Sequence, residues 1–245
     1  MAHLDGKLYH KYERSCYLFL LCYTLFMSTA VRPSRLVRAP RRQARGLRTR
    51  EAILASAVDI ASVNGLDGLT VGTLAAHLHM SKSGLFAHFG SKEDLQLATV
   101  EVARQIFIDK VTRPAIAAPR GLPRLWGLVN QWLLLVEKRV FRGGCFFSAA
   151  SFEFDGKRGV VRDRIAEIMR EWLDALARAV EQAKKVGHLR EDVNPTRLVY
   201  EIHGLAMGAH WAYQLLDDRR AYARAREVVL EKLRANATPS APRLP

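Results

Sequence analysis

The sequence is short of cysteine and of acidic residues, and each shortage excludes a class of protein. Its three cysteines, Cys16, Cys22 and Cys145, are an odd and widely separated set, which forms neither a disulfide framework nor a zinc knuckle. They suit a reducing cytoplasm. Acidic residues number 24 against 38 lysines and arginines, so the formal net charge is +14. Such an excess favours binding to a polyanion, either nucleic acid or an anionic membrane surface.

The sequence also lacks the motifs that carry enzymatic chemistry. It has no phosphate-binding glycine loop, no cluster of metal-ligand residues and no nucleophile motif with a matching base. We therefore expect no catalytic residue, no metal and no cofactor, and a helical enzyme is the main alternative from another class. The hydrophobic fraction of 49% and the charged fraction of 25% are those of a folded protein, and 245 residues suffice for two helical domains.

One uncharged run, CYLFLLCYTLFMSTAV at 16–31, has three interpretations. A bilayer span needs about 20 apolar residues, and this run is shorter and is interrupted by Thr24, Ser28 and Thr29. The hydrophobic region of a signal peptide is closer in length. In the third interpretation translation begins at Met27 and the upstream residues are a start-site artefact. We favour the third, while a membrane tether remains the alternative.

A basic segment follows at 32–50, with eight arginines and no acidic residue. Pro33, Pro40 and Gly46 interrupt it, so it is interpreted as a flexible basic arm and not as a helix. A solvated linker that only aids solubility is the alternative. Residues 1–46 are thus expected to form a leader with an apolar run and a basic arm.

From Thr49 onward the apolar spacing is helical. The pattern predicts a first helix over 49–64, ended by Asn64-Gly65, a second after an N-cap at Thr70, and a third from an N-cap at Ser81 through His88. A capping box at 91–94 opens a fourth helix that runs to about residue 110. Three short helices with a tight turn between the second and third are typical of a helix-turn-helix.

Prolines and a glycine at 114–123 mark a domain boundary. Beyond it the pattern predicts helices at 124–140, about 146–152, from 160 to before 187, from 195 to about 217, and at 221–235. No convincing strand is present, so the fold class is all-α. The predicted domains are 47–110, 111–236 and a flexible tail at 237–245.

The segment LAAHLHMSKSGLFAHFGSKED at 74–94 closely resembles the helix-turn-helix signature of the TetR family of transcription regulators, and the resemblance covers about 49–97. It implies an amino-terminal three-helix domain that binds operator DNA, followed by a helical domain that binds an effector and dimerises. It further implies a cytoplasmic homodimer that binds a palindromic operator in double-stranded DNA, acts as a repressor, and is released by a small-molecule effector that the sequence does not identify.

The sequence departs from the family pattern at two positions. His79 stands where the turn usually carries glycine, and it is expected to adopt the left-handed backbone conformation. Phe86 stands where a tyrosine is usual, so a phenolic hydrogen bond to phosphate is lost there.

A helix-turn-helix places the start of its second helix in the major groove, where side chains meet base edges and phosphates. Basic segments beside such domains can enter the minor groove. Met80, Leu85 and Phe89 are expected in the core, and a surface position without DNA contact is the alternative for His88. The expected DNA contacts are Arg48, Arg50, Thr70, Ser81, Lys82, Ser83, Gly84, Phe86, His88 and Lys92.

Aromatic residues of the second half supply apolar surface for an effector pocket, although most are expected in the core. The candidate pocket residues are Trp126, Phe147, Ser151, Trp172, His203, Met207 and Trp211. Ser148 and Glu153 are further candidates for orienting the effector. The spacing of His203 and His210 is longer than that of a metal-binding pair.

The penultimate helix carries small residues at every fourth position, Gly204, Gly208 and Ala212. This smooth strip permits close approach of a helix from a second subunit across a two-fold axis. We expect a dimer interface there, and close packing within one subunit is the alternative.

Overall fold

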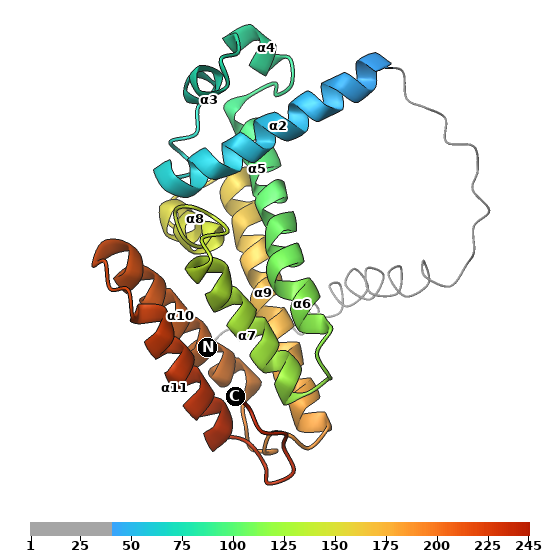
Figure 1. Ribbon diagram of the computed structural model, residues 1–245, viewed down its shortest axis with the longest axis vertical. Helices are drawn as coiled ribbons and strands as arrows, with labels where there is room; N and C mark the ends of the chain where they lie inside the picture. Colours follow the sequence, from blue (N-terminus) through green and yellow to red (C-terminus); the bar gives the residue numbers. More distant parts are fainter. Residues whose placement is uncertain (1–40) are drawn as a thin grey trace, which may run out of the picture. The chain divides into compact units, whose positions relative to one another are not determined.

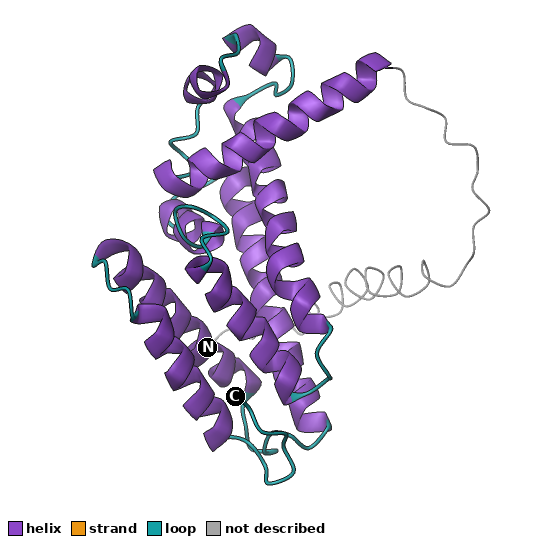
Figure 2. Ribbon diagram, viewed as in Figure 1, coloured by secondary structure: helices purple, strands orange, loops and turns teal. Residues whose placement is uncertain are grey.

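The computed structural model describes residues 41–245, with side-chain surroundings from residue 46 onward, and this part of the chain is built from helices (Figures 1 and 2). Its compact unit is Gly46–Pro245. Among the described residues the β pairing consists of an isolated bridge between Leu189 and Ala237. The predicted all-α class is confirmed. The apolar run at 16–31 and the first part of the basic segment lie outside the described residues.

Within the described residues, four helices form the amino-terminal half, and the α3–α4 pair stands at one end of it (Figure 1). They are α2 (Arg41–Asn64), α3 (Val71–Leu78), α4 (Lys82–Phe86) and α5 (Lys92–Phe107).

The second half is a bundle in which α7 and α9 pack together, and α10 and α11 form an antiparallel pair beside them (Figure 1). Its elements are η1 (Ile108–Thr112), α6 (Arg113–Ile116), α7 (Leu122–Glu137), α8 (Phe146–Phe154), α9 (Val160–Lys185), α10 (Pro195–Leu215) and α11 (Ala221–Ala235). Buried apolar residues of both halves belong to one core cluster.

Helix α2 begins at Arg41, so the prediction of a non-helical arm is wrong for residues 41–50. The prediction treats Gly46 as a helix breaker, but one interior glycine destabilises a helix by only about 1 kcal/mol relative to alanine. Residues 41–50 are therefore helical, and they are not an extended segment of the kind that follows a minor groove.

Pro114 lies inside a helical stretch and not at a boundary, because α5 continues through η1 and α6 to Ile116. Proline lacks the N–H that a regular helix needs, and a π turn, at Ile108–Thr112, lies just before it. Such turns are rare and occur frequently at functional sites. The predicted division after residue 110 thus falls within η1, and the helical path ends at 117–121.

The tail at 237–245 is packed, in contrast to the flexible tail expected from its composition. The Thr238 N–H donates to the His188 carbonyl (3.2 Å), and the Thr238 hydroxyl donates to the Gly187 carbonyl. Ala237, Ala241 and Leu244 lie against the core. The partial burial of these apolar side chains holds the tail in place, although turn-forming residues lie between them.

None of the helices between residues 41 and 245 combines the length and the apolar character that a bilayer span requires.

Candidate functional site

The turn between α3 and α4 is built around His79, which has φ 52° and ψ 37°. The Met80 N–H donates to the Ala75 carbonyl (3.0 Å) and the His79 N–H to the Ala76 carbonyl (3.4 Å), which is the Schellman pattern that ends many helices. The expected left-handed conformation of His79 is confirmed. The tight turn is therefore formed without the usual glycine.

Helix α4 is held by two apolar anchors and exposes its leading end. Leu85 and Phe89 are buried, as predicted for the core. The Ser81 hydroxyl accepts the Gly84 N–H (3.1 Å) and thereby caps the helix. Ser81, Lys82 and Ser83 are exposed, so one cation and two hydroxyl groups stand together at the start of α4. The helix ends at Phe86, two residues before the predicted end.

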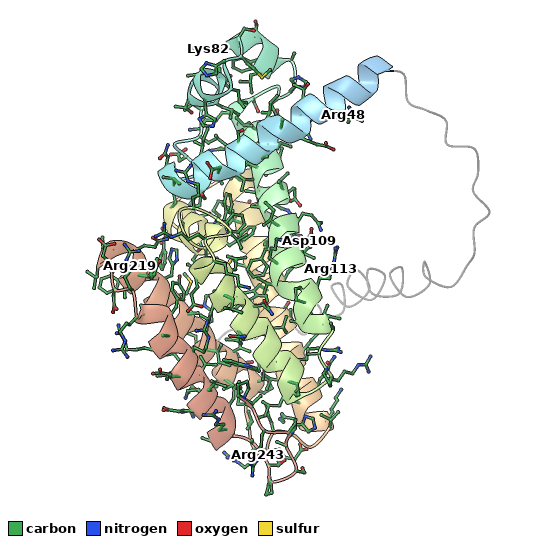
Figure 3. The ribbon with its side chains drawn as sticks, in the orientation of Figure 1. Arg48, Lys82, Asp109, Arg113, Arg219 and Arg243 are labelled. Carbon is green, nitrogen blue, oxygen red and sulfur yellow. The ribbon has the colours of Figure 1, made fainter. Side chains whose placement is uncertain are left out.

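Lys82 is the cation at this leading end (Figure 3). Its aliphatic chain lies over Gly72 of α3, where an added Cβ would meet the lysine Cε at 3.7 Å. No carboxylate among residues 46–245 forms an ion pair with Lys82. Its ammonium group is consequently available to a phosphate or a base edge.

Lys92, another predicted phosphate contact, stands in a different environment. Its Nζ lies 3.0 Å from Asp67 Oδ1, while Nζ of Lys157, in the loop after α8, lies 2.8 Å from the other oxygen of the same carboxylate. Hydrogen bonds from Lys157 and Lys92 lower the pKa of the Asp67 carboxyl to about 2. A phosphate that contacts Lys92 has to share it with Asp67.

The remaining predicted contacts differ in what they offer DNA. Thr70 uses its hydroxyl to cap α3 in a reciprocal pair with Thr73. The Arg50 guanidinium lies 5.1 Å from the centre of the Phe89 ring. This cation–π contact stabilises the position of Phe89, which anchors α4. Arg48 is exposed on α2 (Figure 3), and the Phe86 side chain is 49% exposed. His88 is half-buried.

Part of the predicted effector pocket gathers inside the bundle. The ring of Trp132 lies 5.5 Å from both Trp172 and His203, and Phe107 lies between Trp172 (5.0 Å) and Phe147 (6.1 Å). We call these five residues the aromatic cluster. Sequence reasoning did not select Phe107, because nothing in the spacing shows that the end of α5 meets α9.

Two buried nitrogens of the aromatic cluster, Trp172 Nε1 and His203 Nε2, have no hydrogen-bond partner in the part of the chain that the structure describes. The neighbouring indole of Trp132 differs, since its Nε1–H donates to Cys145 Sγ (3.5 Å). Burial lowers the pKa of His203, so its imidazole is neutral at neutral pH. An unpaired buried donor is costly, and a ligand that accepts a hydrogen bond relieves that cost.

Other predicted pocket residues do not join the aromatic cluster. Trp211 is 53% exposed, because it lies on the outer face of α10. The Ser151 hydroxyl donates to the Ser148 carbonyl within α8 (2.9 Å). Trp126 is buried and Met207 is half-buried, and neither takes part in the ring contacts among the described residues that define the cluster. Two cavities, of about 270 and 200 Å³, are lined by none of the seven predicted residues.

Glu153 points to the amino-terminal half and not to an effector. Its carboxylate accepts the N–H groups of Leu66 (2.8 Å) and Asp67 (2.6 Å) in the segment between α2 and α3. The Gln96 amide of α5 donates to the Leu66 carbonyl (2.9 Å). Helix α8 therefore holds the segment that leads into the helix-turn-helix.

The outer face of α10 combines exposed apolar residues with glycine. Tyr200, Trp211 and Leu215 are 80%, 53% and 66% exposed, and Gly204 and Gly208 lie between them on the same side of the helix. A Cβ added to either glycine would meet no atom within 4 Å. These glycines are thus not needed for packing within one subunit. We call these five residues the α10 face.

Comparison with known proteins agrees with this architecture. Residues 53–99 match the family described as bacterial regulatory proteins, tetR family. Residues 121–229 match the tetracyclin repressor-like C-terminal domain. The HTH-type transcriptional repressor DhaR of Mycobacterium sp. (strain GP1) is 23% identical over 170 residues, which are 69% of this chain and 84% of DhaR.

Solved structures show the same fold. A TetR transcriptional regulator from Chloroflexus aurantiacus superposes with a TM-score of 0.74 at 22% identity, over 79% of this chain and 98% of that one. AibR, solved with isovaleryl coenzyme A and operator DNA, superposes with a TM-score of 0.59 at 24% identity, over 73% and 94% of the two chains. Since the two family matches together cover more than half of the sequence, the chain belongs to the tetR family of transcription regulators.

Proposed function

We propose that this protein represses transcription as a homodimer that binds a palindromic operator through α4 and leaves the operator when a small molecule binds its second half. The observation that carries the proposal is the exposed group Ser81, Lys82 and Ser83 at the start of a short helix anchored by Leu85 and Phe89. A helix presented in this way suits the major groove, where its first residues reach base edges and phosphates.

The α10 face supports pairing of two copies. A dimer presents two α4 helices, and a two-fold axis makes the two half-sites of the operator inverted copies of each other. Smooth glycine positions flanked by exposed Tyr200 and Trp211 permit close helix approach with a large apolar contact.

The aromatic cluster supports an effector site within the bundle. Trp172 and His203 carry buried nitrogens without partners, and Phe107 links them to the end of α5 directly before the π turn η1. Helix α5 begins at Lys92 beside Asp67. A ligand that displaces Phe107 would therefore act on the helix that leads back to the DNA-binding half. AibR, of the same fold, has been solved with both a coenzyme A thioester and operator DNA.

We also propose that the protein acts as a repressor and is located in the cytoplasm. DhaR is a repressor, and operator DNA in a bacterium lies in the cytoplasm. We assign no catalytic step to the chain, since the family is one of regulators.

Selection of bound sequences from random duplexes, followed by footprinting, tests the proposed function. We expect an inverted repeat whose half-site centres lie about one helical turn apart, or a multiple of it. The bound sequence should recur upstream of the protein's own coding region if the protein regulates itself. Absence of any enriched duplex at moderate ionic strength would overturn the proposal.

A further inference from the structure

A cavity of about 200 Å³ lies between the loop that joins α7 to α8 and the loop that joins α10 to α11. Its lining includes Arg139, Arg142, Arg219, Tyr213, Gln214 and Asp217. Three guanidinium groups thus border one cavity, against a single carboxylate in its lining. Each guanidinium has five N–H donors and no acceptor, so donors greatly outnumber acceptors around this space.

The arginines are incompletely paired. Arg142 pairs with Asp59 of α2 (2.7 Å) and Arg219 with Asp217 (2.9 Å). Arg139 forms no ion pair with any residue from 46 to 245, and its guanidinium, after that of Arg219, helps to lower the pKa of the Tyr213 hydroxyl. The hydroxyl also accepts from Arg219 (3.3 Å). One positive charge therefore remains without a counter-ion at the cavity.

The backbone around the cavity is in an unfavourable conformation. Of the three non-glycine residues with positive φ within 41–245, two line this cavity, Arg139 (φ 49°) and Asp217 (φ 53°). They follow the ends of α7 and α10, where glycine would form the same turn at lower cost. Their charged side chains are kept in spite of about 1 kcal/mol or more of strain at each position, and such residues cluster at functional sites.

We propose that this cavity binds a phosphate group, either free or carried by a small metabolite. Arginine forks bind phosphate oxygens through paired hydrogen bonds, and an open cavity admits a group attached to a larger molecule. Arg139 supplies the uncompensated charge, and Arg219 and Arg142 supply further donors. The Gln214 side chain is held at the rim, because its amide donates to the Gly143 carbonyl (2.5 Å).

Occupation of the cavity would affect α2. Arg142 holds Asp59, and the next residue, Gly143, donates its N–H to the Ser62 hydroxyl (3.3 Å). A bound phosphate competes with Asp59 for Arg142 and loosens the carboxyl end of α2. A loosened α2 is expected to weaken DNA binding. This effect on DNA binding rests on the proposed function, whereas the binding of phosphate does not.

Titration of inorganic phosphate into the full chain without DNA, at constant ionic strength in chloride, tests the site by calorimetry. We expect a dissociation constant below about 1 mM. Arg139→Gln removes the charge and the paired N–H donors of the guanidinium, and Arg139→Lys keeps the charge but loses the paired donors. Each variant should weaken phosphate binding about tenfold. Arg113→Gln removes an exposed arginine paired with Asp109, well apart from Arg219 (Figure 3), and should leave the affinity unchanged.

Absence of binding to the unmodified chain would overturn the proposal, as would an equal loss in the Arg139 and Arg113 variants or an unchanged affinity after Arg139→Gln. Equal melting temperatures of the variants exclude unfolding as the cause. Glucose 6-phosphate and succinate are compared with inorganic phosphate, so that a phosphorylated metabolite, a dicarboxylate and the free ion can be distinguished. Tighter binding of succinate than of phosphate would also overturn the proposal.

A second measurement separates this inference from the proposed function. Phosphate should weaken duplex binding severalfold for the unmodified chain and not for Arg139→Gln. If the chain binds phosphate but no duplex, the cavity assignment stands and the proposed function fails.

Discussion

Lys82 and Lys92 have the same charge and were both expected to contact DNA, but of the two only Lys92 forms an ion pair with a described residue, Asp67. Replacement of Lys82 by alanine should therefore leave the melting temperature unchanged and weaken operator binding by about tenfold or more, because one phosphate or base contact is worth about 1–3 kcal/mol. Fluorescence anisotropy with a labelled operator measures the affinity. Lys110→Ala, an exposed lysine in η1, is the control, and equal affinities of the two variants would contradict the role of Lys82.

Two tryptophans of the aromatic cluster offer a matched test of the unpartnered donor. Trp132 donates to Cys145, whereas Trp172 Nε1 has no partner. Trp172→Phe removes a buried donor that gains nothing from folding, so the lost packing is partly offset. Trp132→Phe loses packing and a hydrogen bond together. Chemical denaturation should show the smaller loss for Trp172→Phe, and the reverse order would show that Trp172 has a partner.

His210 links stability to pH. The side chain is buried and its Nδ1 lies 3.2 Å from the Tyr222 hydroxyl, and burial lowers its pKa from the ordinary 6.5. Below that pH the unfolded chain binds a proton that the folded chain refuses, so the free energy of unfolding decreases as pH falls from about 7.5 to about 5.5. His203 shifts in the same direction. Melting curves of His210→Gln should depend less on pH in this window, and an unaltered slope would argue against the assignment.

At the scale of helices, local signals predicted most of the fold. Helix α11 occupies 221–235, as its amphipathic pattern indicated, and the N-caps at Thr70, Ser81 and Ser91 lie where hydroxyl side chains precede apolar stripes. The leading end of α4 was predicted as well, since capping and turn chemistry are local.

The missed features depend on tertiary contacts. The carboxylate of Glu153 finds the Leu66 and Asp67 amides across 87 and 86 residues of sequence, and no local pattern connects them. The effector-pocket prediction selected aromatic residues by type, so it included Trp211 although this side chain faces outward. Predictions from composition were also wrong at residues 41–50 and 237–245. The first segment is helical in spite of its glycine, and the second is packed against the core in spite of its prolines.

Glu153 gives a test of how α8 holds the DNA-binding half. Glu153→Gln keeps the shape but replaces one accepting oxygen with an NH2 group, so one of the two hydrogen bonds is lost and the other loses its charge. The change should cost about 1–2 kcal/mol. Hydrogen exchange of the Leu66 and Asp67 amides should accelerate about tenfold. Glu181→Gln, exposed on α9, should change neither amide. Unchanged protection after Glu153→Gln would show that α8 does not restrain this segment.

At the scale of the whole molecule, we propose that the α10 face determines whether one α4 or two reach the operator. Gly208 lies in that face with open space around it, so a larger side chain there disturbs nothing within the protomer. Replacement of glycine by glutamate in a helix interior even favours the helix, by roughly 0.5 kcal/mol or more. The protomer should therefore stay folded, and any effect of Gly208→Glu reports on a second copy.

We expect Gly208→Glu to sediment as a monomer and to lose at least about 10²-fold in operator affinity, because two linked half-site contacts bind far more tightly than one. Gly156→Glu is the matched control, since Gly156 also has nothing within 4 Å of an added Cβ but lies in the loop after α8. It should remain dimeric and bind normally. If Gly208→Glu is still a dimer, the two copies meet elsewhere. A monomer that keeps full affinity would instead show that a single α4 suffices for recognition.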